Sequence, residues 1–382
     1  MKIIHLCLSC FYIDGYAYQE NQLVAAHVSA GHDVTVIAST ESFDLAKLPC
    51  YLTPGEYIGT DGAKVIRLPY RFSALGRLAP KIRAYPGVNA LLEKLAPDMI
   101  LFHGLCAWEL ITVARFGMLH PLVRIYADCH EDFNNSARTL LSRWGLHFLF
   151  YRPILRYCLS QLQRILCVSQ ESINFAHRMY GVPLHLLELY PLGGQVYEDA
   201  EYLRMRASQR NVQGWHEETR VFIQTGKIDN AKRLVDSLRA FVRLTDKNLR
   251  FAIVGKLMPD ISEQIRPLID SDERIQNLGW ASPELLRALL CAADIYVQPG
   301  SQSATMQMSL CCRCVVVLDD VLSHHVYVDN NGFLVRDATQ LSHALERLAK
   351  APRQQINVMS AYSANLAARL LDYRQLAQRV LR

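Results

Sequence analysis

Two lysines five residues apart, Lys227 and Lys232, stand between a strand pattern and a helix pattern. Residues 221–223 are apolar, as in a buried strand, and the apolar positions of 234–241 recur at helical spacing. Gly226 permits a tight turn between them. The first N–H groups of a helix lack partners within it, and that end is electropositive. We therefore predict a diphosphate site here, although an ordinary strand-to-helix turn with solvated lysines would produce the same pattern.

A second segment repeats this arrangement further along the chain. Residues 295–297 are expected to form a buried strand, 298–303 a polar turn, and 304–311 a short helix with Ser303 as its N-cap. Open parallel sheets bind ligands at the carboxyl ends of neighbouring strands, so the two loops suggest one ligand held between them. Gln307, about one helical turn beyond Ser303, can hydrogen-bond a sugar hydroxyl. The predicted contacts in the two loops are Gly226, Lys227, Lys232, Gly300, Ser301, Ser303, Thr305 and Gln307.

Composition narrows the class of protein. The chain has 382 residues, of which 51% are hydrophobic and 20% charged, as in a folded protein with room for two domains. The net charge of +5 is modest and no aromatic–basic RNA motif is present, so we expect no nucleic-acid partner. The eleven cysteines are scattered through the expected strands and helices, which favours free thiols in a reducing compartment over disulfides.

The expected location is cytoplasmic, with possible contact with the inner membrane face. Met1 is followed at once by a strand pattern rather than by a long apolar signal segment. The most lipid-like run, 144–151, is too short to span a bilayer. A basic run predicts either a solvated surface or a patch that meets an anionic membrane. It comprises Arg67, Arg71, Arg77, Lys81 and Arg83, interleaved with Tyr70, Phe72 and Leu75.

Strand and helix patterns alternate through both halves, which predicts an α/β protein with a doubly wound parallel sheet in each half. The expected domains are 1–194 and 195–360, with the join near Gly193 and Gly194 followed by a polar stretch to about Glu218. Residues 361–382 are expected to form a C-terminal helix that packs back toward the first domain. Two such domains would face a cleft, with a nucleotide-bearing donor in one and an acceptor in the other. Strands are expected at 2–8, 34–38, 64–68, 99–103, 123–127, 164–168, 221–224, 250–254, 275–278, 295–297 and 315–318.

The order of these motifs resembles the retaining, family 4 (group 1) glycosyltransferases of GT-B fold over nearly the whole chain. The Gly226–Lys227 and Lys232 set matches the basic pair that contacts the donor diphosphate in that family. The loop and helix start at 11–21 and the segments 31–36, 167–169, 191–194 and 331–335 are similar to further family motifs. The resemblance implies two Rossmann-like domains and transfer of a sugar from a nucleotide sugar with retention.

The chain departs from the family at one important position. Such enzymes usually carry two glutamates eight residues apart after the strand at 295, and the second holds the donor ribose. These positions are Pro299 and Gln307 here, and Cys312 to Cys314 replace small residues. Gln307 keeps hydrogen-bonding atoms but loses a charge-assisted bond, worth about 1 kcal/mol or more. This substitution bears on donor affinity more than on the class of reaction.

The resemblance also implies how the chemistry is shared. Lys227, Lys232 and the 300–303 loop would stabilise the charge that builds on the β-phosphate, so that no metal or other cofactor is required. His130 would lie near the donor sugar, although a hydrogen-bonded turn histidine would explain it as well. We predict Gly15 and Trp280 on the donor side, with a turn glycine and a core tryptophan as the alternatives. His103, Glu20 and Glu131 are predicted on the acceptor side, although Glu131 and Asp132 are slightly better explained as helix caps.

These patterns favour a glycosyltransferase that acts on a glycan or lipid-linked acceptor in cell-surface polysaccharide biosynthesis. Two alternatives remain open at this point. One is a nucleotide-sugar epimerase on the same scaffold. The other is a non-catalytic subunit that binds a nucleotide sugar, which Gln307 and Cys312 would favour.

Overall fold

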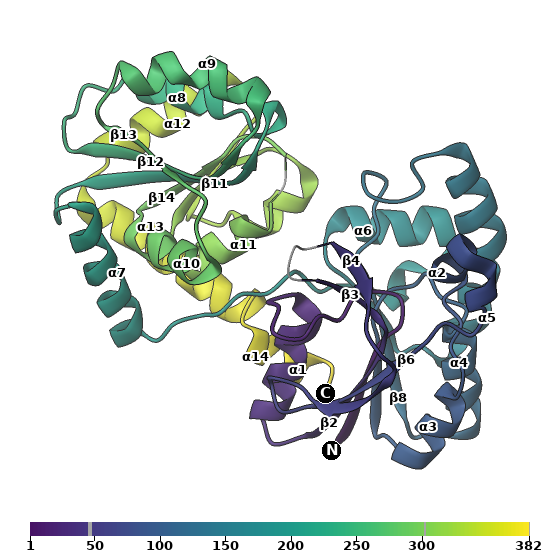
Figure 1. Ribbon diagram of the computed structural model, residues 1–382. Helices are drawn as coiled ribbons and strands as arrows, with labels where there is room; N and C mark the ends of the chain where they lie inside the picture. The colour runs from purple at the N-terminus through teal and green to yellow at the C-terminus, as the bar shows by residue number, and fades with distance from the viewer. Residues whose placement is uncertain (45–47, 302, 382) are drawn as a thin grey trace. The chain divides into compact units, whose positions relative to one another are not determined.

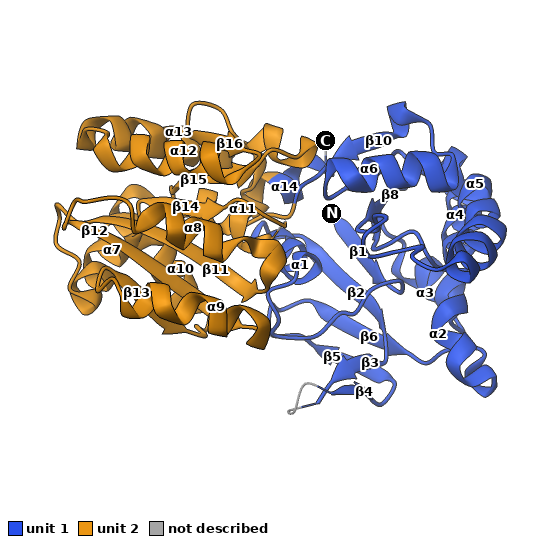
Figure 2. Ribbon diagram, turned by 90° about the horizontal axis from the view of Figure 1, so that it is seen from above, with its two compact units in different colours: residues 1–191, 376–382 blue, residues 192–375 orange. Residues whose placement is uncertain are grey.

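The computed structural model describes residues 1–44, 48–301 and 303–381. The chain divides into two compact units, coloured separately in Figure 2. Unit 1 comprises Met1–Pro191 together with Leu376–Arg382, and unit 2 comprises Leu192–Gln375. Each unit is a layered α/β domain built on its own parallel sheet, so the predicted fold class is confirmed (Figure 1).

Unit 1 is built on an eight-stranded sheet with the order β10-β9-β8-β7-β1-β2-β6-β5. Every neighbouring pair is parallel except β5 and β6, which are antiparallel. The central strands are almost continuously buried, as expected for a sheet covered on both faces. The strands are β1 (Lys2–Cys7), β2 (Asp33–Ser39), β5 (Gly55–Ile58), β6 (Lys64–Leu68), β7 (Met99–Phe102), β8 (Arg124–Cys129), β9 (Arg164–Cys167) and β10 (Leu187–Leu189), beside a hairpin of β3 (Glu41–Phe43) and β4 (Pro49–Tyr51).

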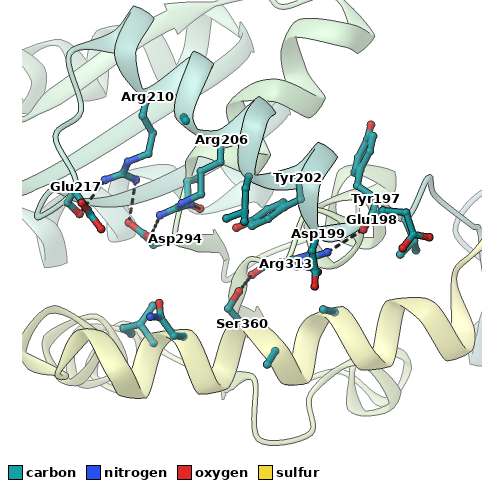
Figure 3. Close-up of a pocket in the computed structure, with 18 of the residues that line it drawn as sticks. Tyr197, Glu198, Asp199, Tyr202, Arg206, Arg210, Glu217, Asp294, Arg313 and Ser360 are labelled. Carbon is teal, nitrogen blue, oxygen red and sulfur yellow. Dashed lines mark hydrogen bonds and ion pairs between the residues drawn. The ribbon is translucent and has the colours of Figure 1, made fainter.

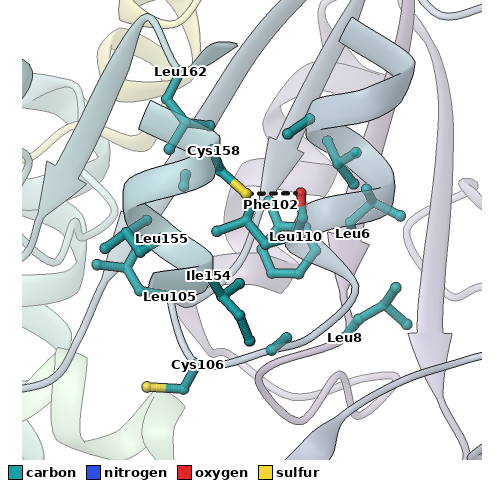
Figure 4. Packing of buried hydrophobic residues seen from close by; sticks show 14 of the residues in the cluster. Leu6, Leu8, Phe102, Leu105, Cys106, Leu110, Ile154, Leu155, Cys158 and Leu162 are labelled. Carbon is teal, nitrogen blue, oxygen red and sulfur yellow. Dashed lines mark hydrogen bonds between the residues drawn. The ribbon is translucent and has the colours of Figure 1, made fainter. Parts of the chain in front are cut away.

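The helices of unit 1 pack on this sheet through a core of aliphatic and aromatic side chains (Figure 4). Phe102 of β7 and Leu110 meet Leu155 in this core, and the Cys158 thiol donates to the Leu110 carbonyl at 3.4 Å. The helical segments are α1 (Gln19–Ser29), α2 (Ala79–Ile82), α3 (Val88–Leu95), α4 (Leu110–Leu119), α5 (Arg152–Cys158) and α6 (Gln170–Phe175), with π-helical turns at Leu141–Tyr151 and Ala176–Tyr180 and 3₁₀ turns at Ser73–Leu78, Leu159–Gln161 and Leu184–Leu186.

Unit 2 is built on a six-stranded, all-parallel sheet with the order β13-β12-β11-β14-β15-β16. Two apolar clusters, one on each face, fill the space between sheet and helices. The strands are β11 (Arg220–Ile228), β12 (Leu249–Leu257), β13 (Ile275–Gly279), β14 (Ile295–Gln298), β15 (Val315–Asp319) and β16 (Gly332–Val335). The helices are α7 (Asp199–Gln213), α8 (Leu234–Phe241), α9 (Pro259–Asp270), α10 (Pro283–Ala292), α11 (Ala304–Cys311), α12 (Ala338–Lys350) and α13 (Arg353–Leu370), with 3₁₀ turns at Asn230–Lys232 and Leu322–Tyr327. Helix α14 (Tyr373–Arg379) begins in unit 2 and ends in the C-terminal segment of unit 1.

The polar stretch that follows the expected join of the domains contains a helix that was not predicted, α7, over most of its length. This helix docks through guanidinium groups, and only Tyr202 and Met205 among its described side chains pack into the apolar cluster. Arg206 donates to the carbonyls of Cys291, Ala292 and Ala293, where α10 has just ended, and pairs with Asp294 at 2.5 Å. A polar helix of this kind carries no hydrophobic period to read in the sequence.

The single helix expected over 361–382 is also corrected. Helix α13 ends at Leu370, and α14 begins at Tyr373. Both Leu371 and Asp372 donate their N–H groups back to the Ala367 carbonyl, which closes the first helix. The Asp372 carboxylate then accepts from the Arg374 N–H at 2.9 Å, which starts the second.

Candidate active site

Two loops of unit 2 follow the carboxyl ends of the neighbouring strands β11 and β14 and are bound to each other. The Ser301 N–H donates to the Ala231 carbonyl at 2.8 Å. The Lys232 ammonium in turn donates to the Ser301 carbonyl at 2.7 Å. Gly300 sits so close that a β-carbon there would lie 2.0 Å from the Ala231 oxygen. The predicted residues Lys232, Gly300 and Ser301 are therefore brought together.

The turn predicted at Gly226 is not present. Strand β11 continues through Gly226, whose φ is 122°, and Lys227 to its end at Ile228. Gly226 lies opposite Gly255 of β12, where an added β-carbon would be 1.9 Å from the Gly226 oxygen. Two glycines in register allow the strands to approach closely, so the ladder extends past the predicted turn.

The two predicted lysines have different surroundings. Lys227 is exposed near the end of β11, whereas Lys232 is buried at the end of a 3₁₀ turn, and α8 begins two residues later. Burial lowers the pKa of Lys232 below its ordinary value. A buried ammonium interacts with an anion more strongly than an exposed one, because water screens it less.

The helix predicted over 304–311 is confirmed as α11, with Ser303 at its N-cap. The Ser303 hydroxyl accepts from the Thr305 N–H and lies 2.8 Å from the Thr305 hydroxyl, which also accepts from Thr225 of β11 at 2.8 Å. With its amide nitrogen oriented toward the Ser303 and Ala304 carbonyls, at 3.2 and 3.3 Å, Gln307 bonds to its own helix. Residue 302 of this loop lies outside the described residues.

Trp280 lies apart from these loops. It follows Gly279 at the end of β13, the edge strand of the sheet, and is 72% exposed. The alternative that Trp280 belongs to the core is therefore excluded.

Unit 1 places charged side chains at the carboxyl ends of β7 and β8. Asp128, on β8, is buried and accepts from the His103 ring at 2.5 Å and from the Gly104 N–H at 2.6 Å. His130 follows the same strand, and its Nε2 atom lies 3.6 Å from Asp128 Oδ1, the oxygen that also accepts from the Gly104 N–H. One carboxylate thus lies between two imidazole rings.

This grouping raises the basicity of both rings. Burial alone would lower the pKa of His130, but the Asp128 carboxylate raises it to about 9. Burial also opposes the charged form of His103, yet Asp128 raises the pKa of His103 to about 10. Burial would raise the pKa of Asp128, but the two histidines hold it well below its usual range. His130 therefore carries a positive charge at neutral pH.

A pocket of about 470 Å³ in unit 1 lies against His130. Glu131 lines this pocket. Its Oε2 atom accepts from the backbone N–H of His130 at 3.2 Å and from the Cys129 thiol at 3.3 Å. Arg83 reaches the same wall and donates to the Ser9 hydroxyl at 2.9 Å. The other lining residues are Pro80, Lys81, Cys106, Asn135, Ser136, Ala137, Arg138, Thr139, Ser142, Leu146, His147 and Tyr151.

Of the remaining predicted residues of unit 1, two are buried, one lies in a turn and two bond within a loop. His103 is fully buried behind Asp128, and Glu20 is buried in the first turn of α1. Gly15 has a φ of 77° in the loop after β1, with no atom within 4 Å of an added β-carbon. The expected helix caps are not found. Glu131 bonds within its own loop, and Asp132 caps a turn by accepting from the Asn134 and Asn135 N–H groups.

The basic run does not form one surface. Arg67, on β6, is buried and donates to the Tyr12 and Ser39 carbonyls. Arg83 lines the His130 pocket, and Arg71 and Arg77 are exposed. Of the helices in the described ranges, none is both long and apolar enough to cross a membrane.

A second cavity, of about 1080 Å³, lies in unit 2 and is lined by none of the predicted site residues. Figure 3 shows Arg206, Arg210 and Asp294 on one side and Ser360 of α13 on another. Arg210 donates to the Ala292 carbonyl at 2.8 Å, and Ser360 to the Arg313 carbonyl at 2.8 Å. These polar groups bond to each other and hold α7 and α13 in place.

Two further features concern metals and thiols. Across residues 1–44, 48–301 and 303–381, no group of three or more His, Cys, Asp or Glu side chains is placed to hold a metal ion. All eleven cysteines are free thiols, and all but Cys10 and Cys50 are buried.

Sequence reasoning missed the residues that complete the unit 1 site. Asp128 carried no predicted role, although an acid two residues before His130 at a strand end was a usable signal. His5 and His27 also contact this network, through His103. They come from β1 and α1, and only the sheet order places them beside β7.

The two α/β units, each with a loop site beyond its strands, define a GT-B-like enzyme. A family profile described as "Glycosyltransferase Family 4" matches residues 17–193, and one described as "Glycosyl transferases group 1" matches residues 219–351. The chain belongs to the family 4, group 1 glycosyltransferases, which transfer a sugar from a nucleotide sugar. No curated protein sequence matches the chain significantly.

Solved structures share this fold over nearly the whole chain. Sucrose-phosphate synthase from Thermosynechococcus elongatus is 15% identical with a TM-score of 0.63, over 99% of this chain and 97% of that one. Anabaena Alr3699/HepE in complex with UDP-glucose is 15% identical with a TM-score of 0.60, over 100% and 98%. WaaG, a glycosyltransferase involved in lipopolysaccharide biosynthesis, is 15% identical with a TM-score of 0.57, over 99% and 98%.

Proposed function

We propose that this protein transfers a sugar from a uridine diphosphate donor, with retention of the anomeric configuration, to an acidic or lipid-linked acceptor of a cell-surface glycan. The observation that carries the proposal is the Asp128–His130 pair beside a pocket in unit 1, in a chain whose unit 2 has the family's two loops. The similarity in fold to a UDP-glucose complex and to a lipopolysaccharide glycosyltransferase supports the donor and the glycan.

Unit 2 supplies the groups that suit a diphosphate leaving group. Lys232 is held by the Ser301 carbonyl, and α11 begins beside Ser303 with its backbone N–H groups making that end of the helix electropositive. Charge that develops on the β-phosphate as the glycosidic bond breaks is stabilised by Lys232 and these N–H groups. An oxygen of the departing β-phosphate then takes the proton of the attacking acceptor hydroxyl. This step requires no enzyme base and no metal ion.

Unit 1 supplies the acceptor pocket. A charged His130 carries a proton on each ring nitrogen: Nε2 faces Asp128, and the Nδ1–H donates to a sugar hydroxyl without His130 accepting a proton. Lys81, Arg83 and Arg138 line the same pocket and are opposed there by Glu131. This excess of positive charge favours an acceptor that carries a phosphate or carboxylate.

A transfer assay with the full chain tests the proposal. UDP-sugars would be incubated with neutral glycans, with acidic glycans and with a polyprenyl-phosphate-linked sugar, and products read by mass spectrometry and anomeric NMR. We expect a retained linkage on an acidic acceptor. Release of an isomerised nucleotide sugar would indicate an epimerase instead. Binding of UDP without transfer or hydrolysis of any UDP-sugar would indicate a non-catalytic subunit.

Matched variants separate binding of the acceptor from hydrolysis of the donor. Arg83→Met is expected to raise the KM for the acidic acceptor roughly tenfold, because one ion pair is lost, while hydrolysis of the donor continues. Arg77→Met removes an exposed charge that does not line the pocket and serves as the control. An equal effect of both variants would contradict an acidic acceptor site at Arg83.

A further inference from the structure

A line of buried imidazole rings runs through unit 1 behind Asp128. The His103 Nε2 atom lies 3.0 Å from His5 Nδ1, and His5 Nε2 lies 3.0 Å from His27 Nδ1. His27 Nε2 lies 3.0 Å from the Ala377 carbonyl oxygen. All three rings are fully buried. We refer to His103, His5 and His27 as the histidine relay.

The Ala377 carbonyl fixes the direction of every hydrogen bond in the relay. A carbonyl oxygen only accepts, so His27 Nε2 must carry a proton. A neutral His27 then accepts at Nδ1, which requires a proton on His5 Nε2. A neutral His5 accepts at Nδ1 in turn, which requires a proton on His103 Nε2. No other arrangement of neutral His5 and His27 satisfies all three contacts.

His103 is therefore doubly protonated. Its Nε2 donates to His5, and its Nδ1 donates to the Asp128 carboxylate at 2.5 Å. The local electrostatics favour the same states, because burial and the neighbouring rings lower the pKa of His5, burial lowers the pKa of His27 to about 4, and Asp128 raises the pKa of His103 against the effect of burial. The relay thus places one fixed positive charge on the side of Asp128 away from His130.

The carbonyl that terminates the relay is itself held in place. It belongs to the C-terminal segment of unit 1, Leu376–Arg382. Tyr190 donates to the Leu376 carbonyl at 2.7 Å, and Arg124 donates to the Leu381 carbonyl at 2.5 Å. Side chains from strand β8 and from the residue that follows β10 therefore fix the segment that orients His27.

We propose that the histidine relay is a positioning device for the transfer site, which keeps Asp128 ionised and aimed at His130 while limiting how tightly Asp128 holds the His130 proton. This role rests on the proposed function only in taking His130 to act in transfer. The charged state of the relay does not depend on it. His103, His5 and His27 touch no substrate and act through Asp128.

Other titratable groups face the network and enter its pH dependence. Cys7 of β1 and Cys10 of the following loop lie on one side, and Glu20 of α1 acts on His103 and His130. Glu131, next to His130, raises its pKa as well. His32 lies beside His27, with ring centroids 6.1 Å apart.

The protonation states can be read directly by ¹⁵N NMR of the full chain with labelled histidine, assigned from spectra of His103→Gln and His130→Gln. In the unsubstituted protein at pH 7, we expect His5 and His27 as neutral rings protonated at Nε2, and His103 protonated at both nitrogens. A neutral His103 at pH 7 would overturn the proposal. This measurement requires no acceptor, so it stands or fails separately from the glycosyltransfer assay.

Substitution at His27 tests the direction of the relay. In His27→Leu the acceptor of His5 is lost, so His5 reverses its tautomer and donates to His103, which then becomes neutral. We expect the pKa of His103 to fall by at least about one unit, and that of His130 to rise, since Asp128 no longer shares its charge. In the donor-hydrolysis assay, the high-pH limb of the pH profile should move with His130.

Two further variants complete the test. His27→Gln can accept from His5 through its amide oxygen and donate to Ala377 through its amide nitrogen, so it should restore both pKa values. His32→Gln lies beside the relay without joining it and should leave them unchanged. If His27→Leu does not fold, the His27→Gln titration and the tautomers of the unsubstituted protein decide the matter. Unchanged His103 and His130 pKa values in folded His27→Leu would refute the relay.

Discussion

The two candidate sites hold their ligand-facing groups in different ways. In unit 1, the His130 site depends on buried charged side chains, with Asp128 between two imidazole rings. In unit 2, the two loops are tied by a main-chain bond from Ser301 N–H to Ala231, by the buried Lys232 ammonium on the Ser301 carbonyl, and by the partly buried Arg233 guanidinium on the Pro299 carbonyl. Substitutions at the unit 1 site should therefore change the charge of the site and its pH dependence, whereas those at the unit 2 site should change loop geometry and donor affinity.

The largest effect is expected at Asp128. Asp128→Asn leaves the His103 imidazolium buried without its counter-ion, so the free energy of unfolding should fall by about 3 to 5 kcal/mol. Urea unfolding at pH 7 measures this loss of stability. Asp132→Asn, in the next loop, loses only local turn bonds and is the control. Equal losses in the two variants would contradict a special role for the buried carboxylate.

The same variant should flatten the dependence of stability on pH. The pKa of His103 is raised to about 10 in the folded protein. Its stabilisation is therefore complete below the unfolded value of about 6.5 and is lost as pH rises toward 10. The low pKa of Asp128 gives stabilisation that is present above about 4 and is lost as pH falls further. Unfolding series at pH 7 and 9.5 should differ less in Asp128→Asn than in the unsubstituted protein.

The next effect sharpens the contrast within unit 2. Lys232→Met should weaken UDP binding by about 10- to 100-fold, because a buried charge-assisted bond is lost. Lys227→Met, at an exposed position, should weaken it only a few-fold, and less at high salt. Isothermal titration with UDP at low and high NaCl measures both. A larger effect at Lys227 would reverse the assignment of the buried lysine as the main diphosphate contact.

A substitution without charge tests the role of loop geometry. A β-carbon at Gly300 would meet the Ala231 oxygen at 2.0 Å, so Gly300→Ala must separate the two loops. We expect a loss of about 1 to 3 kcal/mol in stability together with weaker UDP binding. Gly55→Ala, with no atom within 4 Å of the new carbon, is the matched control. Unchanged UDP affinity in Gly300→Ala would show that the loop contact does not shape the donor site.

The smallest effect is expected at Gln307. A carboxylate cannot donate to the Ser303 and Ala304 carbonyls as the Gln307 amide does, so Gln307→Glu should turn outward and accept from the ribose hydroxyls. UDP affinity should rise by up to about tenfold. Titration with 2′,3′-dideoxyuridine diphosphate, which lacks those hydroxyls, should show no gain. A gain with both ligands would place the new charge away from the ribose.

Much of the fold was predictable, because hydrophobic period and strand–helix alternation are local properties of sequence. Strand β6 and helix α11 have their predicted bounds, and the parallel sheets follow from the alternation. Helix α7 was missed because arginine bonds, not an apolar stripe, dock it. The antiparallel edge strand β5 was missed because its short, exposed pattern carries little signal.

The candidate site was predictable in part for a similar reason. The unit 2 loops follow a sequence pattern of strand, glycine and helix start, and most of their predicted residues lie together. The turn at Gly226 was mispredicted, since its partner Gly255 lies on another strand and is joined to it only by the sheet. The network around Asp128 joins residues far apart in the chain, His5 to His103 and His27 to Ala377, so no local pattern could predict it.

The pairing of Gly226 with Gly255 has a consequence for salt response. It carries β11 and β12 onward, so that Lys227 and Lys256 become register partners on adjacent strands. Like charges at paired positions repel. Added salt should therefore stabilise the paired ends of β11 and β12 in the ligand-free protein, while it weakens the binding of a diphosphate. A bound diphosphate should itself relieve the repulsion between the two lysines, which salt otherwise screens.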